Sequence, residues 1–242
     1  MRIRVINPNT TASMTETIGR AAVEAAAAGT VIEAVTSPTG PVSIEGYVDE
    51  ALCLPGLLIE VRRAEADAVD GIVIACFDDT GLDAARQIAQ APIVGIGEAA
   101  YHAATLIAHR FTVVTTLARS IPALEHNLTR YGFDRRAVVR AAEVPVLALE
   151  DETSDARARI DAEIERALRD DRAEAIVLGC AGMAKLARDL AQKHRCPVID
   201  GVGAAVKLVE MLASLGLKTS KIGAYAATPP KQVTGALAAL AR

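Results

Sequence analysis

The sequence predicts an α/β protein with two similar lobes, each built on a mainly parallel sheet flanked by helices. Short runs rich in β-branched residues alternate along the chain with longer segments rich in Ala, Leu and Arg, which is the pattern of alternating strands and helices. Several of the short runs are apolar on both faces, as strands covered by helices on both sides should be. A stretch of the first half of the chain recurs in the second half, which indicates a duplicated unit.

The expected elements follow one another from the amino terminus. The segments between strands carry apolar residues at helical spacing, for example Ile160, Ile164 and Leu168. A helix is expected over residues 47–66, and a last one over about residues 231–241. Strands are expected at residues 3–7, 31–35, 72–75, 93–96, 112–115, 142–146, 176–179, 198–199 and 222–225.

A cysteine ends the same kind of apolar run in each half of the chain. Residues 71–76 read Gly-Ile-Val-Ile-Ala-Cys, and residues 175–180 read Ala-Ile-Val-Leu-Gly-Cys. The helical segments and the proline-led strands that follow these two runs also match. We therefore expect a first lobe over residues 1–98, to which residues 207–242 return, and a second lobe over residues 99–206, with the active site between them.

Cys76 and Cys180 stand at the ends of expected strands, and ligands of parallel sheets bind beyond this end of the strands. Two thiols that face one substrate carbon can remove a proton from one side and return one on the other. A helix N-terminus near each thiol is expected to lower its pKa. A redox pair is an alternative, but it requires sulfurs about 2 Å apart, which leaves no room for a substrate. Cys53 and Cys196 lie at no duplicated strand end and are interpreted as packing residues.

Composition and charge exclude several classes of protein. The 242 residues are 51% hydrophobic and only 3% aromatic, and their formal net charge is −4, which argues against a nucleic-acid partner. No apolar run approaches the roughly 20 residues that span a bilayer, so no membrane partner is expected. The four cysteines form neither a disulfide framework nor a metal-ligand spacing, which indicates a reduced, cytoplasmic protein without a metal. No glycine pair completes a dinucleotide fingerprint, and no cofactor is expected.

Six short motifs connect this sequence with a known family. They are Ile6-Asn7-Pro8-Asn9-Thr10, Ser43-Ile44-Glu45-Gly46, Ala75-Cys76-Phe77, Gly95-Ile96-Gly97-Glu98-Ala99-Ala100, Thr115-Thr116-Leu117 and Leu178-Gly179-Cys180-Ala181-Gly182-Met183. Over essentially its whole length the chain resembles the hydantoin racemases of the aspartate/glutamate racemase superfamily, which have the allantoin racemases as close relatives. The resemblance implies two lobes related by a pseudo-twofold axis, racemisation without a cofactor, and one catalytic cysteine from each lobe, Cys76 and Cys180.

The loop after the first cysteine departs from the family pattern. Many relatives read Gly-Asp-Pro-Gly-Leu after Cys-Phe, whereas residues 78–82 of this chain read Asp-Asp-Thr-Gly-Leu. This departure bears on loop shape and side-chain preference more than on the chemistry. After the second cysteine, amino-acid racemases of the superfamily usually carry Thr-His. Ala181 and Gly182 stand at that place here, which disfavours a free, charged amino acid as the substrate.

A cyclic ureide, a 5-monosubstituted hydantoin, is therefore the expected small-molecule substrate. Its C5 proton lies beside a carbonyl group, and removal of that proton gives an enolate whose oxygens need hydrogen-bond donors. The expected contacts are backbone groups after each cysteine, polar residues at strand ends and one apolar wall residue. They are Phe77, Asp78, Ala181, Gly182, Asn9, Thr115, Thr116 and Ile44.

Three other functions stay open at this point. Racemisation of allantoin, a ureido-substituted hydantoin, would differ only in the polarity of the side-chain pocket. A one-cysteine decarboxylase or isomerase of the same superfamily would act on carboxylates and would need anion-binding loops. A ligand-binding module without catalysis would not explain a thiol in each lobe. The C5 substituent is open among aromatic, aliphatic and ureido groups, as is the enantiomer that each cysteine serves, and we expect a homo-oligomer.

Overall fold

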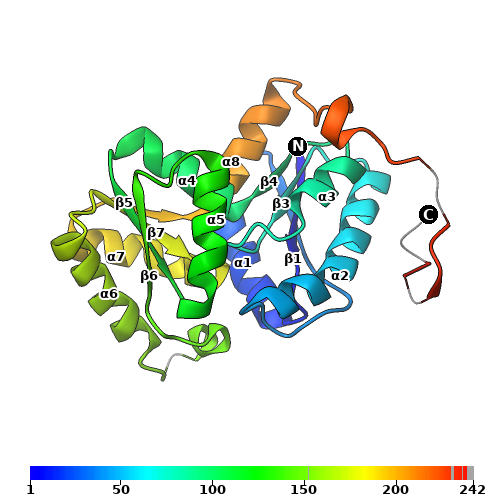
Figure 1. The fold of residues 1–242 in the computed structure, drawn as a ribbon. Helices are drawn as coiled ribbons and strands as arrows, with labels where there is room; N and C mark the ends of the chain where they lie inside the picture. Colours follow the sequence, from blue (N-terminus) through cyan, green and yellow to red (C-terminus); the bar gives the residue numbers. More distant parts are fainter. Residues whose placement is uncertain (152, 230–231, 236, 239–242) are drawn as a thin grey trace.

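The computed structural model describes residues 1–151, 153–229, 232–235 and 237–238. Within these residues the strands form two four-stranded sheets that lie side by side and are flanked by helices (Figure 1). Every strand pairing in both sheets is parallel. The predicted fold class, two similar α/β lobes, is therefore confirmed.

The first sheet has the strand order β2-β1-β3-β4. Its strands are β1 (Arg2–Asn7), β2 (Val31–Thr36), β3 (Gly71–Ile74) and β4 (Ile93–Gly95). The helices of this part of the chain are α1 (Ala12–Ala25), α2 (Tyr47–Ala66), α3 (Leu82–Ile88) and α4 (Ile96–Ile107). All four residues of β3 are buried, which explains why this strand reads as a continuous apolar run.

The second sheet has the strand order β6-β5-β7-β8. Its strands are β5 (Phe111–Thr115), β6 (Ala137–Ala141), β7 (Ala175–Gly179) and β8 (Val198–Asp200). The accompanying helices are α5 (Ile121–Tyr131), α6 (Ala156–Asp170), α7 (Ala187–His194) and α8 (Gly201–Ser214). Short 3-10 helices are η1 (Ala118–Ser120), η2 (Val146–Glu150), η3 (Ala181–Leu186) and η4 (Gly223–Tyr225). When β5 is matched with β1 and β7 with β3, the two strand orders are the same, as the recurring cysteine segments predict.

The strand predicted over residues 142–146 is wrong, because β6 lies five residues earlier at Ala137–Ala141. Glu143 has a positive φ of 56°, and Pro145 has no N–H to donate to a sheet, so neither residue fits a strand. Arg140 interrupts the apolar pattern of the true strand. Its guanidinium is held by two carboxylates, at 2.6 and 3.1 Å, which makes a charged residue acceptable in this half-buried strand.

The strand predicted over residues 222–225 is also wrong, because η4 forms there. Gly223 has a φ of 73°, a left-handed conformation that glycine adopts without steric cost and that turns the chain. Ile222 is 88% exposed, so no neighbouring layer covers the segment as a sheet strand would require. The other expected strands each overlap an observed strand and are confirmed.

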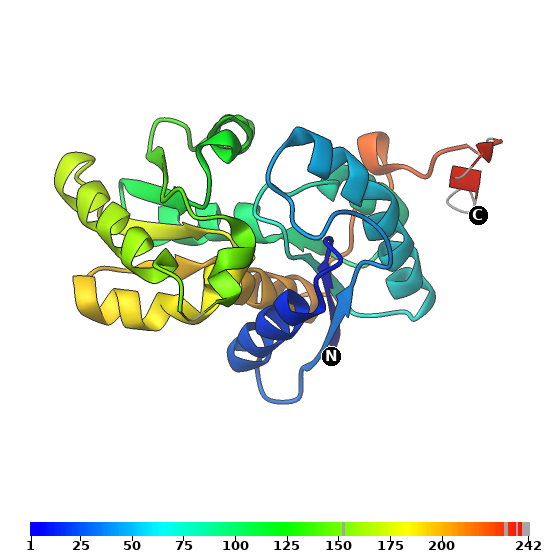
Figure 2. The ribbon, with the colours of Figure 1, turned by 90° about the horizontal axis from the view of Figure 1, so that it is seen from below.

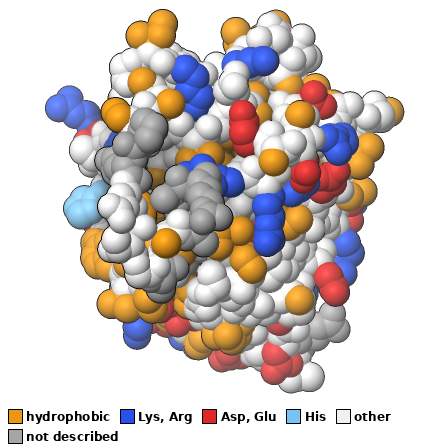
Figure 3. Space-filling model, turned by 90° about the vertical axis from the view of Figure 1, so that its right-hand side faces the viewer, with side chains coloured by type: hydrophobic (Ala, Val, Ile, Leu, Met, Phe, Trp, Pro, Cys, Tyr) orange, Lys and Arg blue, Asp and Glu red, His pale blue; other side chains and the backbone are white. Residues whose placement is uncertain are grey.

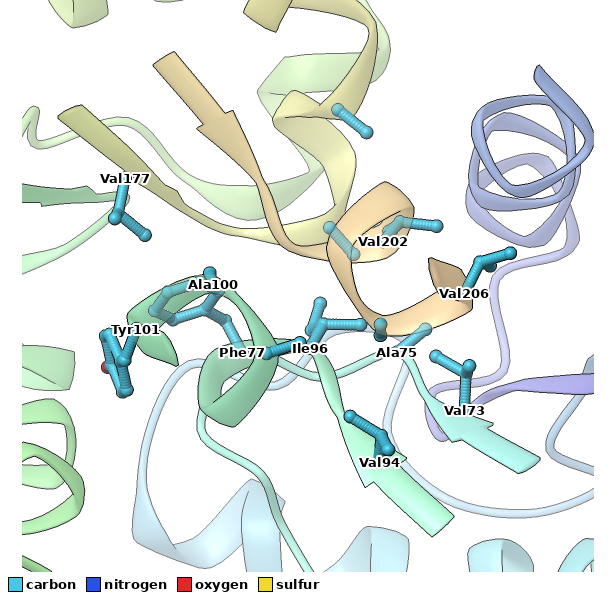
Figure 4. Packing of buried hydrophobic residues seen from close by; sticks show 14 of the residues in the cluster. Val73, Ala75, Phe77, Val94, Ile96, Ala100, Tyr101, Val177, Val202 and Val206 are labelled. Atoms are coloured by element: carbon cyan, nitrogen blue, oxygen red, sulfur yellow. The ribbon is translucent and has the colours of Figure 1, made fainter. Parts of the chain in front are cut away.

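One apolar cluster connects the two lobes (Figure 4). It includes Val177 of β7 and Tyr101 of α4, and α4 also contacts β7 and α8. The ring of Tyr101 packs edge-on against Phe77, with ring centroids 5.5 Å apart, and also lies 6.3 Å from the ring of Phe111. Such aromatic pairs add about 0.5–1.5 kcal/mol beyond burial of their area. Because Phe77 directly follows Cys76, the core itself fixes the position of this cysteine's loop.

The described chain after α8 runs back along the first lobe. Thr219 N–H donates to the Gln90 carbonyl at 2.9 Å, and the Lys221 ammonium donates to the Arg86 carbonyl at 2.6 Å. Helix α8 itself lies between the lobes and contacts α1 and α4 (Figures 1 and 2).

On these contacts we propose the division of the chain into residues 1–98 with residues 207–242, and residues 99–206. The helix expected over residues 231–241 lies partly outside the described residues, and residues 232–234, which are described, are not helical.

Charge is mixed on the face of the first lobe that Figure 3 shows. Lys and Arg side chains alternate there with Asp and Glu, and they form no continuous basic stripe. No helix of the described residues combines the length and the apolar character needed to cross a bilayer.

Candidate active site

One pocket gathers residues from the carboxyl ends of the central strands of both sheets. Asn7 ends β1 and Thr115 ends β5, while Cys76 and Cys180 closely follow β3 and β7. These are the two central strands of each sheet, and ligands of parallel sheets bind beyond this end. The pocket lies between the lobes, and its empty space, which includes open solvent at its mouth, is about 430 Å³.

The pocket brings together nine of the ten residues that the sequence analysis names for the site. The nine are Asn9, Ile44, Cys76, Phe77, Asp78, Thr115, Thr116, Cys180 and Ala181. Gly182 is not among the lining residues. A Cβ added to Gly182 would lie 3.8 Å from the Cys180 sulfur and 3.0 Å from a Leu149 methyl carbon, so glycine at this position keeps the turn behind the cysteine compact.

Several residues that line the pocket are not among those predicted from the sequence. They are Asn7, Pro8, Met14, Ala75, Ser120, Val146 and Gly179. Asn7 and Pro8 belong to the amino-terminal motif with Asn9, and this motif was the available signal for them. Ser120 and Val146 come from η1 and η2, and only the packing of distant segments brings these two residues to the pocket.

The two cysteines occupy matching turns. Asp79 N–H donates to the Cys76 carbonyl at 3.1 Å, and Met183 N–H donates to the Cys180 carbonyl at 3.1 Å. In each turn the backbone N–H of the residue two positions after the cysteine donates to the cysteine sulfur. The duplicated sequence therefore builds the same local support around each thiol. Both thiols are free, as are the other two cysteines of the described chain, so the redox alternative has no disulfide to support it.

Burial raises the pKa of both pocket thiols. It is the largest cause for Cys180, whose pKa is raised to about 12, and for Cys76, whose pKa is raised well above its usual value. The negative charge of Asp78 raises both further. The two backbone N–H donors, and Thr80 Oγ1 at 3.6 Å from the Cys76 sulfur, act in the opposite direction.

The expectation that helix N-termini lower these pKa values is therefore wrong. After Cys76 the chain makes a turn, and α3 begins only at Leu82, while Cys180 precedes a 3-10 helix rather than an α-helix. A helix terminus acts within about one turn, so desolvation dominates at both sulfurs.

Asn9 presents an amide N–H₂ group to the pocket. Its side-chain oxygen already accepts hydrogen bonds from Thr11 N–H at 2.9 Å and from Asn7 Nδ2 at 2.9 Å. Within the described part of the chain its Nδ2 meets only the Met14 sulfur, at 3.4 Å, and sulfur is a weak acceptor. The Asn9 amide is thus oriented as a donor, the polarity that a carbonyl or an enolate oxygen requires.

Helix α5 of the second lobe holds the loop that carries Cys76. Asn127 Nδ2 donates to the Asp78 carbonyl at 2.8 Å, and Tyr131 O–H donates to Asp79 Oδ2 at 2.9 Å. The same Asp79 carboxyl accepts two backbone N–H bonds from the first turn of α4. Burial raises its pKa to about 7, against the opposing effect of these hydrogen bonds.

Cys53 and Cys196 do not line the pocket. The Cys53 thiol is buried and donates to the Glu50 carbonyl at 3.2 Å, a bond that a serine hydroxyl can also make. We expect Cys53→Ser and Cys196→Ser to racemise within about threefold of the wild-type rate, less than 1 kcal/mol in activation free energy. Initial rates by polarimetry on folded protein check this, and loss of turnover in either variant would contradict the assignment of the chemistry to the duplicated pair.

Comparison with known proteins identifies the family. The sequence model of the Asp/Glu/hydantoin racemases matches residues 3–209. The chain belongs to this family. It is therefore an isomerase of the racemase type.

Among the described residues, no group of three His, Cys, Asp or Glu side chains is placed to hold a metal ion.

Named relatives agree with this assignment over nearly the whole chain. A hydantoin racemase from Rhizobium meliloti is 48% identical over 97% of this chain and 98% of its own length. The structure of allantoin racemase from Klebsiella pneumoniae is 51% identical, with a TM-score of 0.97 over 99% of this chain and 98% of that one. The allantoin racemase of Pseudomonas fluorescens is 41% identical, with a TM-score of 0.93 over 97% of this chain and 100% of that one.

Proposed function

We propose that this racemase interconverts the enantiomers of 5-monosubstituted hydantoins, without a cofactor, by proton transfer between C5 and the thiols of Cys76 and Cys180. The observation that carries the proposal is the pair of matching turns that present one thiol from each lobe to a single pocket. Relatives named hydantoin racemase and allantoin racemase support the same substrate class.

The reaction needs one thiolate and one thiol. The thiolate on one face of the ring takes the C5 proton, so the C5–H bond breaks, an S–H bond forms, and the electron pair spreads into the adjacent carbonyl. The opposite thiol then gives its proton to the other face of C5, which inverts the centre and leaves that sulfur as the thiolate. The next turnover can run in the reverse direction with the roles exchanged.

Neutral donors in the pocket are suited to the charge that develops on the ring. The Asn9 amide and the Thr116 hydroxyl are two such donors, because both residues line the pocket. The backbone N–H groups of Phe77 and Ala181, the residues directly after the two cysteines, are two more. Their dipoles stabilise an enolate oxygen without adding a charged group to a buried site. The N–H groups of Asp78 and Gly182, which the sequence analysis assigned to the substrate, already donate to the sulfurs and are proposed to stabilise the thiolates instead.

Racemisation should accelerate with rising pH between about 7.5 and 9. Because burial raises the pKa of the Cys180 thiol to about 12, only a small fraction of this thiol is ionised at pH 8, and that fraction rises about tenfold per pH unit. The pKa of Cys76 is raised as well, so the same direction holds for both bases. Polarimetric rates, corrected for spontaneous racemisation measured without enzyme, check the slope. A profile with its maximum below pH 7.5 would contradict thiols as the bases.

A further inference from the structure

Among the described residues that line the pocket, only Asp78 carries a carboxyl group. Its backbone is fixed on both sides: its N–H donates to the Cys76 sulfur, and its carbonyl accepts from Asn127 Nδ2 at 2.8 Å. No group of the described chain donates a hydrogen bond to its carboxyl oxygens. A partly buried carboxylate that the protein leaves without a donor favours a ligand that brings one.

The charges around this carboxyl have the same sign. Burial and the negative charge of Glu50 raise the pKa of Asp78 to about 7, so Asp78 is mostly ionised at pH 8. The charged groups that act most strongly on Cys180 are Asp78, Glu45 and Glu150, all acidic. Such a pocket repels an anionic substituent and attracts N–H donors and cations.

We propose that Asp78 determines substrate preference: its carboxylate accepts hydrogen bonds from an N–H-bearing substituent at C5 of the hydantoin. The inference rests on the proposed function and narrows its substrate class. We assign the hydrogen bond to the substituent rather than to the ring because the ring becomes negatively charged as its C5 proton leaves. A carboxylate that accepts a hydrogen bond from a ring nitrogen would lie close to that charge and oppose it strongly. A carboxylate that accepts from the substituent lies farther from the charge and opposes it less.

Two kinds of substituent share this chemistry, a neutral ureido group and an alkylammonium group. The test compares kcat/KM for 5-ureidohydantoin, 5-(4-aminobutyl)hydantoin, 5-isobutylhydantoin and 5-(2-carboxyethyl)hydantoin. The wild type should prefer the ureido and aminobutyl compounds over the isobutyl compound, and it should turn over the carboxyethyl compound most slowly. Asp78→Leu should lower the preference for the ureido over the isobutyl compound by about 10- to 100-fold, the effect of losing a hydrogen bond to a charged group.

The Asp78→Asn variant distinguishes a neutral ureido substituent from a charged ammonium substituent. The variant keeps a carbonyl acceptor but loses the charge, so preference for the ammonium compound should fall more than preference for the ureido compound. This variant is nearly isosteric and also carries the test if Asp78→Leu fails to fold. Asp83→Asn is the matched control, because Asp83 is an exposed acid in the first turn of α3 that pairs with Arg130 at 2.6 Å and does not line the pocket. It should leave the preferences unchanged.

The outcomes distinguish this inference from the function on which it rests. Two results would overturn the role of Asp78 and leave the proposed function standing. One is a wild-type kcat/KM for isobutylhydantoin equal to that for the ureido and aminobutyl compounds. The other is an Asp78 variant in which kcat/KM for all four compounds changes by the same factor. A wild type that racemises none of the four would overturn the proposed function.

Discussion

Replacing either Cys76 or Cys180 by serine is expected to lower the rate of racemisation by about 10²–10⁴-fold, the range typical of a lost general acid or base. A serine hydroxyl is far too weak an acid to form the required anion near neutral pH. The substitution exchanges the sulfur for a smaller oxygen and leaves the backbone unchanged, so the turn that follows each cysteine, closed by a backbone hydrogen bond of 3.1 Å, should persist. The loss would then reflect chemistry rather than misfolding.

Proton exchange should survive in each variant on one enantiomer only. Removal of the C5 proton is local to one face of the ring, whereas inversion needs both faces. Cys76→Ser should therefore exchange C5–H for deuterium, with retention of configuration, in the enantiomer that presents its proton to Cys180. Cys180→Ser should show the opposite enantiomer preference. NMR in D₂O, corrected for spontaneous exchange, measures both.

The Cys53→Ser variant is the matched control for this experiment, because Cys53 is buried but does not line the pocket. It should racemise and exchange both enantiomers. If Cys76→Ser or Cys180→Ser racemised near the wild-type rate, that cysteine would be a bystander. If both variants exchanged the same enantiomer, the two thiols would not lie on opposite faces of C5.

Most of the fold could be predicted from the sequence because the central strands are buried on both faces. Residues of β3 and β7 are buried throughout, so each reads as an uninterrupted apolar run, and the cysteine after each run marks where the strand ends. β6 could not be placed in this way. Its Arg140 breaks the apolar pattern, and the acids that pair with it, Glu163 and Asp171, lie 23 and 31 residues later in the chain.

The site residues that follow strand ends could be predicted from the sequence. Those that reach the pocket only through the packing of distant segments could not. Asn9, Cys76, Thr115 and Cys180 come from the strand ends or the loops directly after them, and such places are visible in a sequence. Val146 reaches the pocket only through the packing of η2. The direction of the thiol pKa shifts was also hidden, because it depends on how completely distant segments exclude water from the sulfurs.

Asp79 is expected to stabilise the protein as well as the site. Its buried carboxyl accepts bonds from Gly97 N–H at 3.0 Å, Glu98 N–H at 2.7 Å and Tyr131 O–H at 2.9 Å. It therefore ties the cysteine loop to the start of α4 and to helix α5 of the other lobe. Asp79→Ala would leave these donors without an acceptor, and each unsatisfied buried donor costs about 1–3 kcal/mol.

We expect Asp79→Ala to lower the free energy of unfolding by about 3–5 kcal/mol, the combined effect of the orphaned donors with partial rescue by water. It should also lower kcat by about 10- to 100-fold, because a displacement of the Cys76 loop by about 1 Å misaligns the base. Asp83→Ala, which removes an exposed ion pair with Arg130, should cost less than about 1 kcal/mol and leave kcat unchanged. Urea unfolding and polarimetry measure both quantities in both variants. Equal effects of the two substitutions would show that the Asp79 carboxyl does not fix the loop, since the two acids lie in the same stretch of chain and differ in what their carboxyls hold.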